Sequence, residues 1–266
     1  MFYYFGYGSN MSVRSLEAKG VSPLSSEPAI IDGWSLCFDI PDFFRIEGGT
    51  GNVGRADDDT VHGVLHACRD RDLATLDRLE ALGISYERIE ATAMTYGGRR
   101  VRAFVYRGIP GILDADGMPS ARYKKLLLRG AQHMRIDPGY IERLRTIPVK
   151  KTPGYPAFVF PDAPDERFRL EDLKGRPMLV ALGGAVFDMT EARPRHAYLQ
   201  RLLAGKDATL LFLRRMACSD GSETFEDLRD DDLGPAQRQH MNDYLHEFAR
   251  EYRYVGRLAY AASTQV

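Results

Sequence analysis

The sequence predicts an α+β protein in which a mixed, barrel-like β-sheet with helices is followed by a smaller α+β region. Two observations carry this prediction. In residues 29–106, runs of β-branched and aromatic residues follow one another with one helical stretch among them, which favours a largely antiparallel sheet. After residue 150 the chain becomes proline-rich, and helix and strand patterns resume beyond it. At 266 residues and 44% hydrophobic, the chain can bury one large or two modest cores.

The chain opens with a short strand that ends in a turn of small residues. Tyr3-Tyr4-Phe5 are β-formers, Gly8-Ser9-Asn10 is typical of a turn, and Ser12 stands where it can cap a helix from Val13 to about Lys19. Such a turn leaves backbone N–H groups pointing into a cleft, where they can hold a carboxylate or an oxyanion. The alternative is an ordinary first strand and tight turn.

The barrel-like sheet is expected from five β-segments. They are Ala29–Ile31, Ser35–Ile40, Val61–Ala67, Ile89–Tyr96 and Arg100–Tyr106. Asp32-Gly33 and Gly97-Gly98 are expected as turns, the second closing a hairpin. Residues 48–59 are too rich in glycine and charge to predict regular structure, so they are either a flexible loop over a cleft or a solvated connection.

Residues 71–82 predict a helix, because four leucines recur at helical spacing and define one buried face. Glu80 falls at the C-terminal end of this helix, where the helix dipole disfavours a carboxylate and tends to raise its pKa. A partly desolvated carboxylate in that position is suited to accept a proton near neutral pH. The alternative is a helix glutamate that faces solvent.

An amphipathic helical hairpin is expected over residues 119–148. Pro119-Ser120 begins a helix with an apolar stripe, and Asp137-Pro138 begins a second short helix through Leu144. Beyond it, residues 151–167 read as a linker between a first domain at 1–150 and a second at 168–266. The elements expected in the second domain are helices at Leu170–Leu173, Ala197–Leu203, 207–217 and Gly234–Glu251, and strands at Met178–Leu182 and Ala185–Met189.

Composition limits the partners and the compartment. With 36 basic and 37 acidic residues, the chain has no net positive electrostatic potential that would attract nucleic acid or an anionic membrane. No apolar run is long enough to span a bilayer. The three cysteines, Cys37, Cys68 and Cys218, are few and widely spaced, which favours a reducing compartment. No signal peptide precedes the first strand, so we expect a soluble, cytoplasmic protein.

Histidines give no metal-binding pattern. His62, His66 and Cys68 alternate along a strand-like run without a fourth ligand at recognisable spacing, so structural roles are favoured. His240 and His246 are not spaced to form a metal pair on a helix. We expect no metal site.

Three segments, in this order along the chain, resemble the gamma-glutamyl cyclotransferase family. The run from Phe5 to Met11, FGYGSNM, contains the family's YGSN signature, and LDRLE followed by Tyr86 is similar to its LDxxEG…Y segment. The run PSARYKKLLLRGA, from Pro119, matches PSxxYxxxxxxGA. Ala81 departs from the family's usual glycine, and the spacing from the glutamate to the tyrosine is one residue shorter than expected.

The resemblance implies an enzyme that cyclises the glutamyl group of a gamma-glutamyl amine, amino acid or peptide to 5-oxoproline and releases the free amine. It implies Glu80 as the catalytic acid and base, and it requires neither metal nor organic cofactor. The substrate contacts it implies are Tyr7, Gly8, Ser9, Asn10, Tyr86, Ser120 and Tyr123. Core packing remains an alternative for Tyr123. The leaving amine and the oligomeric state stay open.

Residues 168–260 resemble the cytochrome b5-like haem and steroid-binding domains. The segments FRLEDL, MLVALGGAVFDMT, AGKDAT and YRYVGRL occur in the family's order. The GPGGPY stretch that carries that family's haem-ligating tyrosine is absent, and His196 and Tyr198 are the nitrogen and oxygen donors in its place. A surface histidine and a packed tyrosine are favoured over haem ligands. The competing function is therefore an inactive binding or regulatory protein whose second domain binds haem, steroid or a partner.

Overall fold

The computed structural model describes residues 1–114, 117–214 and 233–259. The chain forms two compact units, Met1–Thr152 and Pro153–Val266. Cys218 and the end of the helix expected over 207–217 lie outside the described residues. No helix in the described ranges is long and apolar enough to cross a membrane.

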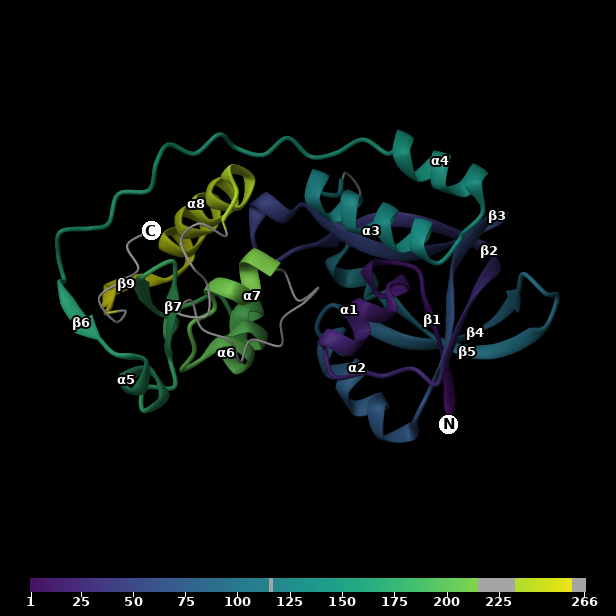
Figure 1. The fold of residues 1–266 in the computed structure, drawn as a ribbon, viewed down its shortest axis with the longest axis horizontal. Coiled ribbons are helices and arrows are strands. Elements are labelled where there is room, and N and C mark those ends of the chain that lie inside the picture. The colour runs from purple at the N-terminus through teal and green to yellow at the C-terminus, as the bar shows by residue number, and fades with distance from the viewer. Residues whose placement is uncertain (115–116, 215–232, 260–266) are drawn as a thin grey trace. The chain divides into compact units, whose positions relative to one another are not determined.

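The first unit is built on a closed five-stranded barrel with strand order β1-β3-β2-β4-β5 (Figure 1). The strands are β1 (Phe2–Gly6), β2 (Ser25–Pro41), β3 (Gly49–Cys68), β4 (Tyr86–Thr95) and β5 (Arg100–Gly108). β1 pairs parallel with β5, and the other neighbours pair antiparallel. The predicted mixed, barrel-like sheet is confirmed, as is the hairpin at Gly97-Gly98.

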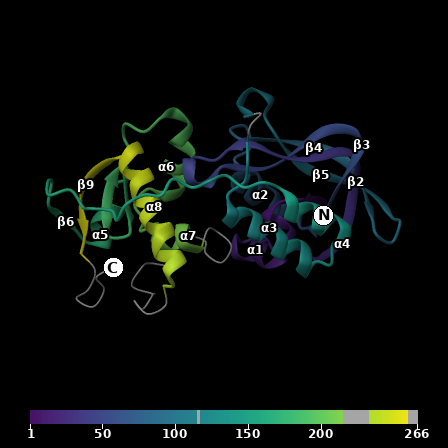
Figure 2. The same cartoon turned by 90° about the horizontal axis from the view of Figure 1, so that it is seen from above.

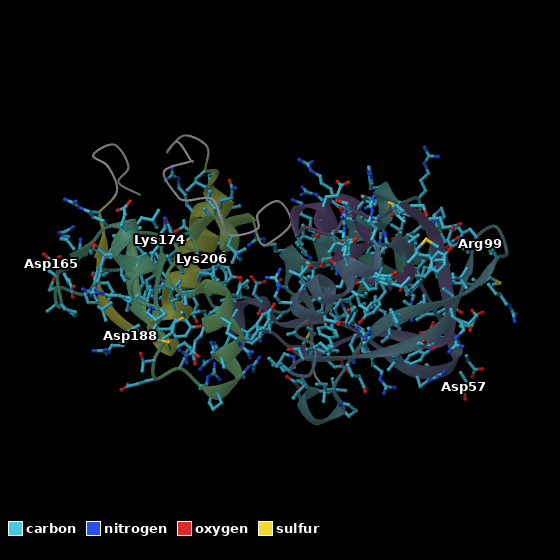
Figure 3. All side chains as sticks on the ribbon, turned by 90° about the horizontal axis from the view of Figure 1, so that it is seen from below. Asp57, Arg99, Asp165, Lys174, Asp188 and Lys206 are labelled. Carbon is cyan, nitrogen blue, oxygen red and sulfur yellow. The ribbon has the colours of Figure 1, made fainter. Side chains whose placement is uncertain are left out.

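The expectation for residues 48–59 is wrong, because all but the first of them belong to β3. Strand pairing brings Gly49 so close to β2 that a Cβ there would lie 1.7 Å from the carbonyl oxygen of Phe38. The glycines therefore permit close backbone packing within a sheet. The three aspartates at 57–59 are tolerated because charged side chains can point outward from a strand. Asp57 lies at the periphery of the unit, as does Arg99 (Figure 3).

The expected turn at Asp32-Gly33 is also wrong, because it is a β-bulge within one long strand. The register between β2 and β3 shifts between Asp32 and Trp34, and Gly33 has φ of 76°, a left-handed conformation that favours glycine. A bulge and a turn have the same local sequence preferences, and here pairing with β3 on both sides carries the strand through.

The described residues of the first unit form four α-helices beside the barrel: α1 (Val13–Ala18), α2 (Leu73–Leu79), α3 (Ala121–His133) and α4 (Pro138–Thr146). The side chains of Ser12, Ser120 and Asp137 accept hydrogen bonds from backbone N–H groups of the first turns of α1, α3 and α4, as their sequence positions predict. α2 is shorter than expected and follows a 3-10 turn, Asp70–Asp72. α3 and α4 pack on the barrel through an apolar cluster that includes Met11, Phe38, Tyr123, Leu127 and Leu144.

The second unit contains a four-stranded sheet in the order β6-β9-β8-β7. Its elements are β6 (Glu166–Phe168), α5 (Leu170–Lys174), β7 (Leu179–Leu182), β8 (Ala185–Asp188), α6 (Ala197–Leu203), α7 (Thr209–Arg214), α8 (Pro235–Glu251) and β9 (Arg253–Leu258). The expected helices and strands are present within the described residues, whereas β6 and β9 were not predicted. β9 pairs with both β6 and β8, so it is central to the sheet.

Part of the expected linker runs past α8 (Figure 2) and is hydrogen-bonded to it. Asn242 accepts a hydrogen bond from the backbone N–H of Phe158 at 2.7 Å and donates one to the carbonyl oxygen of Pro156 at 2.9 Å. The ring of His246 stacks on Tyr155 at 4.7 Å, and the Tyr155 hydroxyl donates to Glu247 at 2.5 Å. This segment is therefore held by specific contacts within the second unit.

Candidate active site

Glu80 lies where α2 ends and the chain turns into a left-handed conformation. The N–H of Ala81 bonds to the carbonyl of Arg78 at 3.2 Å, and the N–H of Leu82 bonds to that of Asp77 at 2.9 Å. These two bonds form a Schellman motif, which usually has glycine in the left-handed position. Ala81 takes that position with φ of 48°. The alanine thus adopts a glycine-type turn that fixes the backbone after Glu80.

The loop after β1 reaches Glu80 directly. The Asn10 side-chain amide donates a hydrogen bond to Oε1 of Glu80 at 2.5 Å, and its Nδ2 lies 3.0 Å from the Tyr4 hydroxyl. On the other side of the amide, the Lys19 ammonium donates to Asn10 Oδ1 at 2.7 Å. Asn10 and Glu80 are 70 residues apart in the sequence. The fold therefore joins two of the residues that the sequence singled out.

The surroundings of Glu80 raise the pKa of its carboxyl above the usual range. Burial is the largest cause, and the positive charge of Lys19 and the hydrogen bonds from Asn10 and Tyr4 oppose it. The sequence also predicts a raised pKa for Glu80, but the main physical cause in the structure is desolvation rather than the helix dipole. A carboxylate with a raised pKa accepts a proton more readily near neutral pH.

Three of the tyrosines predicted to line the site converge on Gly51 in β3. Tyr86 donates to its carbonyl oxygen at 2.8 Å, and the Tyr7 hydroxyl lies 3.4 Å from the same oxygen while donating to the Tyr106 carbonyl at 2.5 Å. The Tyr123 hydroxyl accepts from the Gly51 N–H at 3.2 Å. Tyr7, Tyr86 and Tyr123 therefore form one assembly around a glycine.

Close packing around the Tyr123 hydroxyl requires two glycines. A Cβ on either Gly8 or Gly51 would lie 2.9 Å from that oxygen. The Tyr123 ring also packs edge-on against Phe38, with ring centroids 6.2 Å apart. Tyr123 thus links the core of the first unit to the loop after β1, and its hydroxyl touches the region of the predicted substrate contacts.

A further feature of the loop after β1 is its backbone amides. Among the described residues, no group accepts a hydrogen bond from the N–H of Gly8, Ser9 or Asn10. His66 holds the loop in place. Its Nε2 lies 2.9 Å from the Asn10 carbonyl oxygen, and its Nδ1 lies 2.7 Å from Ser26 Oγ. Burial lowers the pKa of His66 to about 4, so the ring is neutral and structural at pH 7.

Ser120 has its hydroxyl engaged within the protein. Its Oγ accepts from the Tyr123 N–H at 3.1 Å as the cap of α3, and donates to the buried Glu47 carboxylate at 3.3 Å. The contacts of Ser120 orient the helix that carries Tyr123. A direct substrate contact for Ser120 remains a prediction.

Four residues of the site escaped the sequence reasoning: Tyr4, Lys19, Thr50 and Gly51. The hydroxyl of Thr50 lies 3.3 Å from that of Tyr86. The glycine run at 48–54 was the available signal for Gly51, because close backbone approach is a common reason for glycine in a strand. No local pattern indicated Lys19.

The barrel of the first unit has relatives among solved structures. Its fold is similar to a solved structure described as a gamma-glutamyl cyclotransferase, with 23% identity, a TM-score of 0.51, and coverage of 58% of this chain and 92% of the other. An uncharacterized protein from Homo sapiens is similar to the same extent, with 24% identity, a TM-score of 0.52 and the same coverage of both chains. At this identity the likeness concerns the fold.

Sequence relatives define the family. The sequence profile for "Gamma-glutamyl cyclotransferase, AIG2-like" matches residues 4–125. The gamma-glutamyl cyclotransferase verK of Clonostachys rogersoniana is 30% identical over 148 residues, which cover 46% of this chain and 80% of that protein. The gamma-glutamylcyclotransferase of Bos taurus is 27% identical over 151 residues, covering 55% and 78%. The chain belongs to the gamma-glutamyl cyclotransferase family.

Proposed function

We propose that the first unit converts a gamma-glutamyl amine, amino acid or peptide into 5-oxoproline and a free amine, with Glu80 as general base and acid. The observation that carries this proposal is the 2.5 Å hydrogen bond between the loop residue Asn10 and the Glu80 carboxylate. It supports a desolvated base close to the loop whose backbone N–H groups we propose as anion-binding donors. Base and anion-binding groups are the two components that this reaction needs.

The substrate supplies its own nucleophile. Glu80 removes a proton from the α-ammonium group, and the freed amine attacks the γ-carbonyl carbon to close a five-membered ring. The new C–N bond forms a tetrahedral intermediate with an oxyanion, and its collapse re-forms the carbonyl and breaks the old C–N bond while the leaving nitrogen receives the proton from Glu80. The ring nitrogen gives up its second proton through the same carboxylate to the departing amine, which leaves as an ammonium ion. Ring closure is intramolecular, so it has the entropic advantage of a preassembled reaction. No water is consumed.

The backbone N–H groups of Gly8, Ser9 and Asn10 bind negative charge in this scheme, either the α-carboxylate of the substrate or the oxyanion of the intermediate. A well-placed donor to an oxyanion contributes roughly 3 kcal/mol to transition-state stabilisation. The hydroxyls of Tyr7 and Tyr86 lie at the carbonyl oxygen of Gly51, and burial raises the pKa of both. They therefore stay neutral at pH 7 and repel no carboxylate.

The test is release of 5-oxoproline from a panel of gamma-glutamyl amides, amino acids and peptides, including glutathione. The proteins compared are wild type, Glu80→Gln and the matched control Glu17→Gln, whose side chain is exposed on α1. We expect wild type and the control to release product from at least one panel member and Glu80→Gln to be slower by at least 1000-fold, on the order of a lost catalytic base or more. Equal rates in a folded Glu80→Gln protein would remove Glu80 from the mechanism.

For the second unit we propose a cytochrome b5-like fold in which His196 does not ligate haem. In support, the β7–β8 hairpin, the helices that follow and β9 occur in the order of the resembling segments. His196 is fully buried, contrary to the expectation of a surface position, because Nδ1 lies 2.8 Å from the Tyr252 hydroxyl and Nε2 lies 3.3 Å from Arg193. Both ring nitrogens thus face protein groups, which does not fit an axial ligand.

The competing function is an inactive protein whose second unit binds haem, steroid or a partner. Addition of hemin to the purified protein distinguishes this binding function from the proposed one, with the absorbance spectra of wild type and His196→Ala compared. We expect that wild type forms no stoichiometric Soret band that is lost in His196→Ala. A band that forms with wild type and is lost in His196→Ala would contradict the proposed role, and its appearance together with absent 5-oxoproline release would favour the binding protein.

A further inference from the structure

Lys19 is held at a defined place beside the active-site loop. It is the C-cap residue that follows α1 and precedes a Schellman turn, in which the N–H of Gly20 bonds to the carbonyl of Glu17 at 3.0 Å and the N–H of Val21 bonds to that of Leu16 at 2.9 Å. Gly20 has φ of 82°, the left-handed conformation that this turn requires. The backbone of Lys19 is therefore fixed, and its ammonium reaches Asn10 at 2.7 Å.

The Asn10 amide lies between a group that only donates and a group that only accepts. An ammonium can only donate hydrogen bonds, and an ionised carboxylate can only accept them. With Oδ1 toward Lys19 and Nδ2 toward Glu80, both contacts are satisfied. A flipped amide would place its NH₂ group against the ammonium and its oxygen against the carboxylate. Lys19 therefore selects one of two amide orientations.

We propose that Lys19 is a positioning residue of the active site, which holds the Asn10 amide so that its NH₂ group points at the Glu80 carboxylate. The proposal rests on the proposed function in one respect, the use of Glu80 as the base. It adds a residue that touches neither the substrate nor the reacting atoms, and that acts through Asn10 and through its charge.

The charge of Lys19 acts on a carboxylate that otherwise faces neutral groups. In the described part of the chain, the side chains that influence the ionisation of Glu80 or are influenced by it are Asn10, Lys19, Tyr4, Tyr7, Tyr86 and Tyr106. The pKa values of these tyrosines are raised, chiefly by burial, so at pH 7 the lysine is the charged member of the group. Its loss raises the pKa of Glu80, because a nearby positive charge favours the ionised carboxylate.

Three variants separate the hydrogen bond from the charge. Lys19→Arg keeps both, Lys19→Gln keeps a donor and loses the charge, and Lys19→Met loses both. Arg14→Gln is the matched control, because it removes one positive charge from an exposed side chain of the same helix. Glu80→Gln identifies the carboxyl signal of Glu80 and reports on the assignment of the base.

The primary readout needs no substrate. Carbon-13 NMR of protein labelled at the glutamate carboxyl carbons gives the pKa of Glu80 and shows whether each variant is folded. We expect an upward shift of about one pH unit in Lys19→Met and Lys19→Gln, and no change in Lys19→Arg or Arg14→Gln. With a gamma-glutamyl substrate that wild type cleaves, the acidic limb of the pH profile of kcat/KM should shift with the pKa of Glu80. Lys19→Met should lose on the order of tenfold to hundredfold in kcat, and Lys19→Gln less.

The outcomes separate the two proposals. An unchanged pKa of Glu80 in folded Lys19→Met overturns the role of Lys19, whether or not a substrate has been found. If Glu80→Gln is inactive while Lys19→Met has the wild-type pH profile and rate, the positioning role alone is wrong. If Glu80→Gln is as active as wild type, the proposed base is wrong, and the NMR shift still reports on the contact between Lys19 and the carboxylate.

Discussion

Replacement of Asn10 by Asp is the sharpest perturbation of the site, because the side chains have the same shape and differ in one group. The amide nitrogen lies 2.5 Å from Glu80 Oε1, so the substitution puts a second carboxylate oxygen at that distance. Two unit charges this close repel by about 7 kcal/mol at an effective dielectric constant of 20, equivalent to roughly five pH units. The two carboxyls therefore share one proton at neutral pH.

Two consequences follow for Asn10→Asp. Glu80 is no longer a free base at pH 7, so 5-oxoproline release should fall to near the level of Glu80→Gln and recover only at higher pH. The variant should also lose stability as the pH rises from 5 to 8, because an acid whose pKa is raised in the folded state destabilises that state above its unfolded pKa. Lys19, which faces the other side of Asn10, reduces the effect but stays bound to a single oxygen.

The assays are the pH dependence of kcat/KM and of the thermal unfolding midpoint, with Asn10→Leu as the control. The leucine variant removes the hydrogen bond and adds no charge, so its stability relative to wild type should change much less with pH. Two results for Asn10→Asp would together refute the placement of Asn10 against Glu80. The variant would have wild-type activity at pH 7, and its thermal unfolding midpoint would differ from that of wild type by the same amount at pH 5 and pH 8.

Three further variants test other contacts. Tyr123→Phe should lower the free energy of unfolding in urea by about 1–3 kcal/mol, because the Gly51 N–H loses its acceptor; no change would mean that this amide finds another partner. Gly51→Ala should reduce kcat/KM at least tenfold, because the added Cβ would lie 2.9 Å from the Tyr123 hydroxyl. Wild-type activity in this variant would contradict the close packing around Gly51. Asn242→Ala should speed limited proteolysis within residues 153–160, since that side chain bonds to Pro156 and Phe158; an unchanged cleavage rate would show that the stacking contacts suffice.

Local sequence predicted the features that depend on neighbouring residues. The helix caps at Ser12 and Ser120, the hairpin at Gly97-Gly98 and the end of α2 near Glu80 all follow from short-range preferences. The strand from Gly49 was missed because glycine and aspartate are poor strand formers on their own. Pairing along β2 over the same stretch outweighs that preference.

Long-range contacts account for what the sequence could not show. The pairing of β9 with β6 joins segments about 90 residues apart, and no local pattern reveals that partner. His196 was expected at the surface, but Tyr252 supplies a hydrogen-bond partner that makes burial possible. Lys19 belongs to the site only because α1 ends in a turn that directs it to Asn10.

The identity of the product tests the central claim most directly. A panel substrate that wild type cleaves is turned over in water enriched in oxygen-18, and the glutamyl product is identified by mass spectrometry. Attack by the substrate's own amine predicts 5-oxoproline with no oxygen from solvent, formed in equal amount with the free amine and dependent on Glu80. Glutamate that carries one solvent oxygen would contradict the mechanism, because it would show that water, and not the amine, attacks the γ-carbonyl.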